Sequence, residues 1–135
     1  MLLVKDVLKP LSEVAFSSPF VKVRDIMKQM HQDNLRSVIV ERANEHDAYG
    51  IVTYKDILEA IVAEEGDVDL LNVYDIYSKP AIQVHKEMNV KYVAKLMIRY
   101  DVRRVMVMDG TELIGVLSMQ DIIEMLTINL EQEES

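Results

Sequence analysis

The stretch GIVTYKDILEAI, residues 50–61, returns 65 positions later as GVLSMQDIIEML, residues 115–126. Four of the twelve aligned pairs are identical, and five more are conservative exchanges between apolar or between hydroxyl side chains. Each copy begins with a short apolar run typical of a buried strand and continues with apolar residues at helical spacing. The chain therefore contains a duplicated strand–helix segment.

The duplication extends upstream of this stretch. Residues 23–40 align without gaps on residues 90–107, an offset of 67, with six identical pairs among the eighteen. Earlier still, the opening segment Val4–Val7 corresponds to Val73–Ile76. Three blocks that recur in the same order indicate a tandem repeat, and they predict two domains, residues 1–66 and residues 67–135.

Capping, turn and apolar patterns predict the same series of elements in both copies. In the second copy we expect a strand at 81–84 after Pro80, a helix from Asn89 to about 100, strands at 104–108 and 113–117 joined by Asp109–Gly110, and a helix from Ser118 to about 127. In the first copy we expect a helix opened by Ser17, Ser18 and Pro19, strands at 37–40 and 50–52, and a helix from Thr53 to about Glu65 that stops at Gly66.

The expected fold class is α+β. Each copy forms a βαββα unit, in which a small mixed sheet is flanked by helices. Because neither unit has enough apolar surface to be stable alone, we expect the two tandem units to pack on each other about a pseudo-twofold axis.

Half of the residues are apolar, 28% are charged and the net charge is −8, as in soluble globular chains. Charged residues interrupt the apolar start after Val4, so we expect no signal peptide. No apolar run approaches the ~18 residues of a membrane helix. The absence of cysteine excludes disulfides and thiolate metal sites. These features predict a cytoplasmic protein that does not enter a membrane.

The sequence offers little support for catalysis. It has no cysteine nucleophile, and His31, His46 and His85 occupy unrelated positions. Neither a glycine-rich phosphate loop nor a metal-ligand spacing occurs. Nucleic-acid binding requires a basic face, which a net charge of −8 disfavours. We therefore expect no enzyme, no required cofactor or metal ion, and no nucleic-acid partner.

The recurring string Gly-x-x-(Ser/Thr)-x-x-Asp allows two interpretations. It places Thr53 before Asp56 and Ser118 before Asp121. One interpretation is a capping box at the start of a helix. The other is a ligand site, because amides at a helix N-terminus favour an anionic group and a carboxylate can accept both hydroxyls of a ribose through charge-assisted hydrogen bonds. The two roles are compatible.

Over about residues 4–127 the chain resembles a pair of cystathionine-β-synthase (CBS) domains, the arrangement called a Bateman module. The resemblance rests on the duplicated block, on the basic residue that opens the middle strand, and on the opening Asp-x-(apolar) segment with a nearby Lys-Pro, Lys9–Pro10 and Lys79–Pro80. It implies a regulatory module that binds an adenosine-containing ligand, AMP, ADP or ATP, as an energy or metabolite sensor.

The same resemblance assigns roles to individual residues. Asp56 and Asp121 become the ribose acceptors, with Thr53 and Ser118 beside the ribose and phosphate. The residues that it directs toward the phosphates carry the planar fork of donors that suits this group; they are Arg36, Arg103 and Arg104. The apolar residues that it places around the adenine are Ile51, Ile82 and Val116.

The second copy is expected to hold the better site. Ser37 stands where the second copy has Arg104, which removes a cation from the first site. The stretch from Pro10 to Val23 is also three residues longer than its counterpart, which alters the expected adenine wall of the first site.

Two alternatives from other classes remain: a structural dimerisation or docking module without a nucleotide, and a sensor of S-adenosylmethionine. We also expect a flat homodimer, because large apolar patches are uncommon on monomers and a twofold axis is the commonest closure. The residues expected at its interface are Ile57, Ile61, Ile122 and Met125. A CBS pair that stands alone would pass its signal to a protein partner, whose identity the residues do not indicate.

Overall fold

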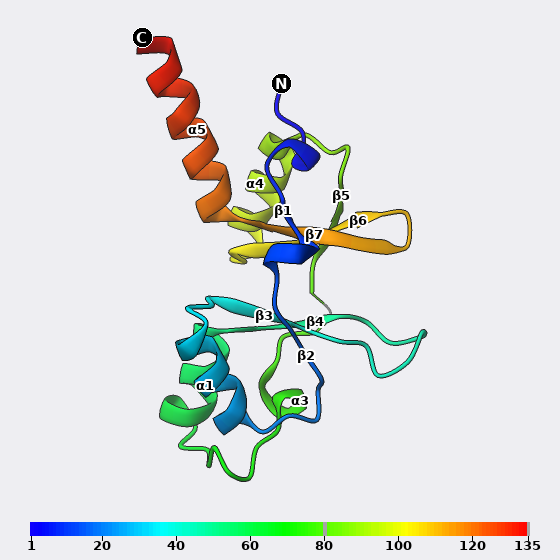
Figure 1. The fold of residues 1–135 in the computed structure, drawn as a ribbon, viewed down its shortest axis with the longest axis vertical. Coiled ribbons are helices and arrows are strands. Elements are labelled where there is room, and N and C mark those ends of the chain that lie inside the picture. Colours follow the sequence, from blue (N-terminus) through cyan, green and yellow to red (C-terminus); the bar gives the residue numbers. More distant parts are fainter. Residues whose placement is uncertain (80, 135) are drawn as a thin grey trace. The chain divides into compact units, whose positions relative to one another are not determined.

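The structure is a computed structural model that describes residues 1–79 and 81–134, so Pro80 of the second Lys-Pro pair lies outside the described residues. Among the elements, η1 and η2 are 3₁₀ turns and η3 is a π-helical turn. In chain order the elements are η1 (Val4–Asp6), β1 (Lys9–Pro10), η2 (Leu11–Glu13), β2 (Phe16–Ser17), α1 (Val23–Gln32), β3 (Ser37–Val40), β4 (Gly50–Thr53), α2 (Tyr54–Leu58), η3 (Glu59–Ala63), α3 (Val73–Ile76), β5 (Gln83–His85), α4 (Val90–Arg99), β6 (Arg104–Asp109), β7 (Glu112–Ser118) and α5 (Met119–Glu134) (Figure 1).

These elements belong to two compact units. The terminal unit contains residues 1–14 and the chain from residue 82 onward, and the middle unit contains residues 15–81. Each sequence repeat therefore contributes residues to both units. The division at residue 66 stays a prediction about the repeats, and the compact units have other limits.

The middle unit is built on a three-stranded sheet in the order β2-β3-β4 (Figure 1). Strand β2 runs parallel to β3 and is connected to it through α1, whereas β4 returns antiparallel to β3. Helices α1 and α2 bury their apolar stripes against one face of this sheet. The core residues are Ile26, Met30, Val38, Val40, Val52, Ile57 and Val73.

Helix α1 does not begin where the sequence predicted. Ser17 lies in β2 instead, because the backbone around it completes the edge of the sheet: Glu41 N donates to the Ser17 carbonyl at 2.9 Å. The helix begins at Val23, the first of the residues that the apolar stripe buries. Tertiary pairing thus prevailed over a local capping pattern at Ser17–Pro19.

The terminal unit contains a four-stranded sheet in the order β1-β7-β6-β5. Strand β5 runs parallel to β6 and is connected to it through α4. Asn89 caps the start of α4, since its side chain accepts a hydrogen bond from Lys91 N at 2.8 Å. Gly110, with φ +62°, closes the β6–β7 hairpin. The core residues are Val4, Val84, Val90, Val93, Met97, Val105, Val107, Leu117 and Ile122. The α+β class with small mixed sheets is confirmed.

Each unit contains the opening segment of the other repeat. Val4, from the first repeat, is fully buried in the core of the terminal unit, where its amide donates to the Met88 carbonyl at 2.9 Å. Val73, from the second repeat, is fully buried in the middle unit, where its amide donates to the Val21 carbonyl at 2.8 Å. This reciprocal exchange makes each unit depend on residues from both repeats.

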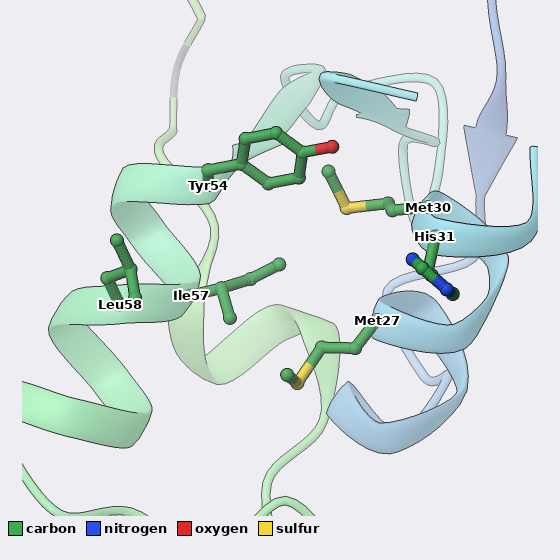
Figure 2. A pocket seen from close by; sticks show the side chains of 6 residues that line it. All are labelled: Met27, Met30, His31, Tyr54, Ile57 and Leu58. Carbon is green, nitrogen blue, oxygen red and sulfur yellow. The ribbon is translucent and has the colours of Figure 1, made fainter. Parts of the chain in front are cut away.

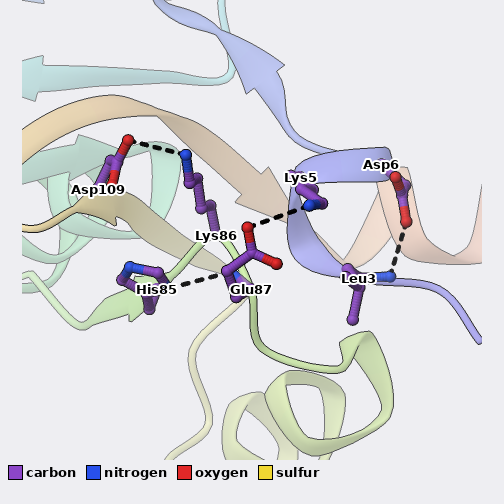
Figure 3. A network of polar contacts seen from close by, with 7 residues as sticks. All are labelled: Leu3, Lys5, Asp6, His85, Lys86, Glu87 and Asp109. Carbon is purple, nitrogen blue, oxygen red and sulfur yellow. Dashed lines mark hydrogen bonds and ion pairs between the residues drawn. The ribbon is translucent and has the colours of Figure 1, made fainter.

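Polar contacts hold the first opening segment in place (Figure 3). The Asp6 carboxylate accepts a hydrogen bond from Leu3 N at 3.0 Å and so closes η1. Lys5 pairs with Glu87 at 3.0 Å, which links the segment to the turn after β5. Exposed pairs of this kind each contribute little stability, so burial of Val4 carries most of the attachment.

The helices after β4 and β7 differ from the prediction in which of their residues face the core, and in their length. Ile57 and Ile122, expected at a dimer interface, belong instead to the cores of their units, and Ile61 and Met125 are partly exposed. The solvent-facing apolar residues lie one position further on, at Leu58 and Ile123. One residue corresponds to about 100° around a helix, so periodicity alone placed this face incorrectly.

Helix α5 continues to Glu134, beyond the predicted end near residue 127. Within residues 1–79 and 81–134, none of the helices has the length and apolar character needed to cross a lipid bilayer.

Candidate functional site

The two repeated motifs occupy the same structural position in their units. Each lies at the junction between the last strand of the sheet and the helix that follows, β4 to α2 in the middle unit and β7 to α5 in the terminal unit. A strand–helix junction leaves backbone amides without helical partners. Both aspartates therefore lie one turn into a helix with their carboxylates beside such amides.

In the middle unit, Asp56 forms a capping box with Thr53. Its Oδ2 accepts hydrogen bonds from the Thr53 amide at 2.8 Å and from the Thr53 hydroxyl at 3.0 Å. Its Oδ1 accepts a hydrogen bond from the Ser78 hydroxyl at 2.9 Å. Since a carboxylate offers about four lone-pair sites, Asp56 retains capacity for further donors.

In the terminal unit, Asp121 and Ser118 form the equivalent box. The Ser118 amide donates to Asp121 Oδ2 at 3.0 Å, and the Asp121 amide donates to the Ser118 hydroxyl at 3.0 Å. Asp121 is only 9% exposed, and its Oδ1 lies 3.7 Å from the ammonium of Lys9. That distance makes a looser contact than a hydrogen bond, so Oδ1 is the more available oxygen of this carboxylate.

The structure thus realises the capping interpretation at both motifs. In each, Oδ2 caps the helix while Oδ1 faces a residue of the exchanged opening segment, Ser78 or Lys9. The ribose role expected from the sequence would use Oδ1, the oxygen outside the helix cap. The geometry therefore leaves the two roles compatible, since different oxygens serve them.

Two of the predicted phosphate-binding arginines flank the motif of the terminal unit. Arg104 begins β6 directly opposite Ser118 on the neighbouring strand, and the carbonyl of Arg103 accepts a hydrogen bond from the amide of Met119 at 2.9 Å. In the middle unit Ser37 is opposite Thr53, and Arg36 precedes it with an exposed side chain. The sheet register therefore brings these basic positions beside the hydroxyl residues of the motif.

The predicted adenine-pocket residues are less closely associated. Ile51 and Val116 lie in β4 and β7 and are 8% and 7% exposed. Ile82 precedes β5, where its carbonyl accepts from the Met106 amide at 2.8 Å and its side chain packs against the core of the terminal unit. Of the three, Ile51 and Val116 immediately follow the motif glycines, whereas Ile82 lies two strands away in the sheet.

The motif glycines permit close approach of the exchanged segments. A β-carbon added at Gly115 would lie 2.3 Å from the Lys9 carbonyl oxygen, and one added at Gly50 would lie 2.0 Å from the ring of Tyr77. Such separations are far below van der Waals contact. The glycine of the motif is thus explained by packing of the opening segment, independently of any ligand.

Comparison with protein-family models adds a decisive observation to this geometry. The model described as CBS domain matches twice, at residues 4–63 and residues 73–128. The chain belongs to the CBS domain family. Its two matches make it a CBS pair, as the resemblance of the sequence implied.

Known proteins similar to this CBS pair include an uncharacterised protein of Methanopyrus kandleri, 32% identical over 90% of the chain. The chain spans 63% of that relative's length. A hexameric CBS-CP12 protein from bloom-forming cyanobacteria is 35% identical, with a TM-score of 0.82 over 91% of this chain and 70% of its own. A CBS domain pair in complex with 5′-methylthioadenosine and S-adenosyl-L-methionine shares the fold, with 23% identity and a TM-score of 0.74 over 93% of this chain and 99% of its own.

Sequence reasoning missed that Lys9 and Ser78 contact the motif aspartates of the CBS pair. It aligned the two Lys-Pro pairs, an offset of 70, which would make Lys79 the equivalent of Lys9. In the sheets, however, Lys9 is opposite Val116 and Ser78 is opposite Ile51. The matching Val4 and Val73, an offset of 69, predict this register and were the better signal.

Lys79, which follows α3, has a different role, because it contacts the loop between β3 and β4. It forms an ion pair with Asp47, whose carboxylate also accepts hydrogen bonds from Ala43 N at 3.0 Å and Ala48 N at 2.9 Å. The hydrogen bond from Lys79 lowers the pKa of Asp47 to about 2. The pair therefore orders the loop between β3 and β4.

An apolar hollow lies between two helices of the middle unit, and neither motif aspartate is among its lining residues. Side chains of α1 and α2 line a volume of about 450 Å³, and Figure 2 shows Tyr54 and Ile57 pointing toward α1. The lining residues are Met27, Met30, His31, Tyr54, Ile57 and Leu58. The apolar lining suits contact with another apolar surface better than recognition of a nucleotide.

Among residues 1–79 and 81–134, His, Asp and Glu side chains do not gather in groups of three or more that could hold an ion.

Proposed function

We propose that this CBS pair is a regulatory module that binds an adenosine-containing small molecule. The observation that carries the proposal is the pair of aspartates, Asp56 and Asp121, held at equivalent junctions with one carboxylate oxygen outside the capping bonds. A CBS pair of the same fold was solved with 5′-methylthioadenosine and S-adenosyl-L-methionine, which supports an adenosine-type ligand.

In this proposal the carboxylates bind the ribose. Oδ1 of Asp56 or Asp121 accepts hydrogen bonds from the ribose hydroxyls, which are strengthened by the charge of the acceptor. The hydroxyls of Thr53 and Ser118 lie beside the same groups. Because Oδ2 remains on the helix cap, the helix keeps its start while the ligand binds.

AMP, ADP and ATP are the ligands that the basic residues favour. Arg36 in the middle unit and Arg103 and Arg104 in the terminal unit lie next to the motif hydroxyls, where guanidinium groups can bind phosphate oxygens in a bidentate way. Ile51, Ile82 and Val116 supply apolar surface for the adenine. The terminal unit, with two arginines, is the stronger candidate for a nucleotide.

Binding is tested by thermal unfolding with AMP, ADP, ATP, S-adenosylmethionine and GTP at equal concentration. A ligand that binds only the folded state stabilises it by about 2.7 kcal/mol at a hundred times its Kd. We expect the adenosine ligands to raise the Tm more than GTP does. An equal response to all five would contradict an adenine site. A full response from the double variant Asp56→Ala, Asp121→Ala would contradict the ribose-binding role of the two aspartates.

A docking module without a nucleotide is the second candidate. It is favoured by solvent-facing apolar residues on the helices that follow the motifs, Leu58 and Val62 in the middle unit and Ile123 in the terminal unit. Either function would operate through a protein partner in the cytoplasm. Failure of every adenosine ligand to stabilise the chain, together with a stable self-assembly, would favour this candidate.

A further inference from the structure

The two candidate sites differ at one structurally equivalent position. Strand pairing sets Lys9 opposite Val116 and Ser78 opposite Ile51, and Val116 and Ile51 are equivalent in the repeat. The residues just before them agree, because Leu8 packs over Gly115 as Tyr77 packs over Gly50. Lys9 and Ser78 are therefore the same position of the fold in the two units.

This position contacts the oxygen that the ribose would use. Ser78 donates a neutral hydrogen bond to Asp56 Oδ1 at 2.9 Å. Lys9 places an ammonium 3.7 Å from Asp121 Oδ1, and its side chain is 58% exposed, so its flexible stem can reorient. The two equivalent carboxylates thus have different neighbours. Asp56 faces a neutral hydroxyl in the middle unit, and Asp121 faces a cation in the terminal unit.

A second position repeats the difference in charge. Ser37 is opposite Thr53 in the middle unit, and Arg104 is opposite Ser118 in the terminal unit. In the middle unit the nearest lysine of the opening segment, Lys79, is paired with Asp47. Beside its motif, the middle unit therefore has Ser78 and Ser37 at the positions where the terminal unit has Lys9 and Arg104.

We propose that the two sites sort adenosine ligands by charge, with Lys9 and Ser78 as specificity-determining residues. The terminal-unit site, at Asp121, selects adenosine that carries a phosphate. The middle-unit site, at Asp56, accepts adenosine derivatives without one, such as a neutral thioether or a sulfonium. This inference rests on the proposed function, since it assigns a ligand class to each of its two sites.

The physical argument concerns what happens to the Lys9 ammonium. When ribose hydroxyls donate to Asp121 Oδ1, the ammonium loses its place beside that oxygen and needs another anion. A phosphate on the same ligand supplies it, whereas uncharged adenosine leaves it to water. At Asp56 the displaced Ser78 hydroxyl is neutral and can turn to water at little cost, so a phosphate gains less there than at Asp121.

The test compares AMP with adenosine by isothermal titration of the full chain. Each site is isolated by removing the other aspartate, with Asp56→Ala or Asp121→Ala. At the isolated Asp121 site, Lys9→Ser is expected to weaken AMP by about tenfold, the loss of one charge-assisted contact, and not to weaken adenosine, which no longer displaces an ammonium. At the isolated Asp56 site, Ser78→Lys is expected to strengthen AMP relative to adenosine.

Two matched variants guard against indirect effects. Lys5→Ser makes the same change of charge in the same unit, at a residue that pairs with Glu87 rather than with the motif, and should leave AMP affinity unaltered. Lys9→Arg retains a cation and should retain the preference for AMP. Because Lys5 and Lys9 are exposed, we expect their variants to be as stable as the chains that carry them, which thermal unfolding will verify for every variant.

The outcomes separate this inference from the proposed function. If Lys9→Ser weakens AMP and adenosine equally, or weakens neither, charge sorting is wrong while adenosine binding stands. If Lys5→Ser weakens AMP as much as Lys9→Ser, the effect is one of net charge and the assignment to Lys9 is wrong. If the unaltered chain binds neither ligand, the proposed function itself is overturned, and this inference with it.

Discussion

Asp121 combines two roles that a single substitution can separate. We expect Asp121→Ala to lower the free energy of unfolding by about 0.5–2 kcal/mol through loss of the helix cap. If Asp121 also binds a ribose, nucleotide affinity falls by about tenfold to a few hundredfold, because charged hydrogen bonds contribute about 1.5–3 kcal/mol each. Urea unfolding and titration with AMP on the same variant measure both effects.

Asp56→Ala is the companion variant. It removes the equivalent cap and the contact to Ser78, and we expect a similar loss of stability with a smaller loss of AMP affinity. An Asp121→Ala chain that is less stable but binds nucleotide as before would leave Asp121 as a capping residue only.

Asp47 makes stability depend on pH in a defined acid window. Its pKa is lowered from 3.8 to about 2, chiefly by the hydrogen bond from Lys79. A depressed carboxyl pKa contributes stability above the unfolded value, and that contribution is lost as pH falls from about 4 toward 2. We expect Lys79→Met to flatten this part of the stability profile, measured by urea midpoints at pH 5, 4, 3 and 2.

Lys55→Met, which makes the same charge change on the exposed side of α2, is the control for general charge effects. If its profile matches that of Lys79→Met, the acid dependence comes from net charge and not from the Asp47–Lys79 pair.

At the scale of elements, α1 and α4 end in the same way. Asn34 and Asp101, equivalent in the repeat, both have φ +53°. After each, an amide bonds back to the helix, Leu35 N to the Met30 carbonyl at 2.8 Å and Val102 N to the Met97 carbonyl at 3.0 Å. This is the Schellman ending, which favours glycine at the left-handed position. The short polar residues there are tolerated in that conformation.

We expect Asp101→Gly to raise the free energy of unfolding by up to about 1 kcal/mol, because the left-handed conformation costs a side chain more than it costs glycine. Asp33→Gly makes the same exchange at φ −97° and should lower stability by about 0.5–1 kcal/mol. Urea unfolding of the two variants compares them directly. Equal effects of the two would show that backbone conformation is not the determining factor.

The left-handed residue after the second helix is Glu65, one position before the glycine at which the sequence placed the end of that helix. The sequence placed the end of the second helix at Gly66, and the helical residues do end just before it, at Ala63. Glu65 has φ +56°. Gly66 is needed because an added β-carbon would lie 2.7 Å from the Ala60 carbonyl oxygen.

At the scale of the whole molecule, we propose that the chain self-associates through Leu58, Val62 and Ile123, which are 59%, 65% and 63% exposed. In the middle unit, the apolar hollow that Leu58 lines (Figure 2) adds to the exposed apolar surface. We expect light scattering to give the mass of a dimer or a larger assembly, and Leu58→Glu or Ile123→Glu to lower it. A monomer mass for the unaltered chain at micromolar concentration would contradict self-association.

Ile57→Glu is not a useful substitute for these variants. Ile57 belongs to the core of the middle unit, so a buried unpaired carboxylate there would unfold the unit. Only the structure distinguishes Ile57 from Leu58, because adjacent apolar residues on a helix carry no sign of which one faces the core.

The sequence by itself determined the duplication, the α+β class, the order of the main elements and the two capping motifs, Thr53–Asp56 and Ser118–Asp121. These features depend on residues close together in the chain, such as hydrogen bonds across three positions and apolar residues at strand or helix spacing. Internal repetition strengthened each assignment, because a pattern seen once recurred at the equivalent place. The family followed from the same repeated block.

Only the tertiary structure decided which partners the motifs receive. Lys9 reaches Asp121, more than a hundred residues away in the chain, and Ser78 reaches Asp56, because each opening segment pairs with the sheet of the other repeat. Pairing with β3 likewise drew Ser17 into a strand rather than a helix. Local patterns carry no record of such pairings, since their free energy comes from surfaces that meet only when the chain has folded.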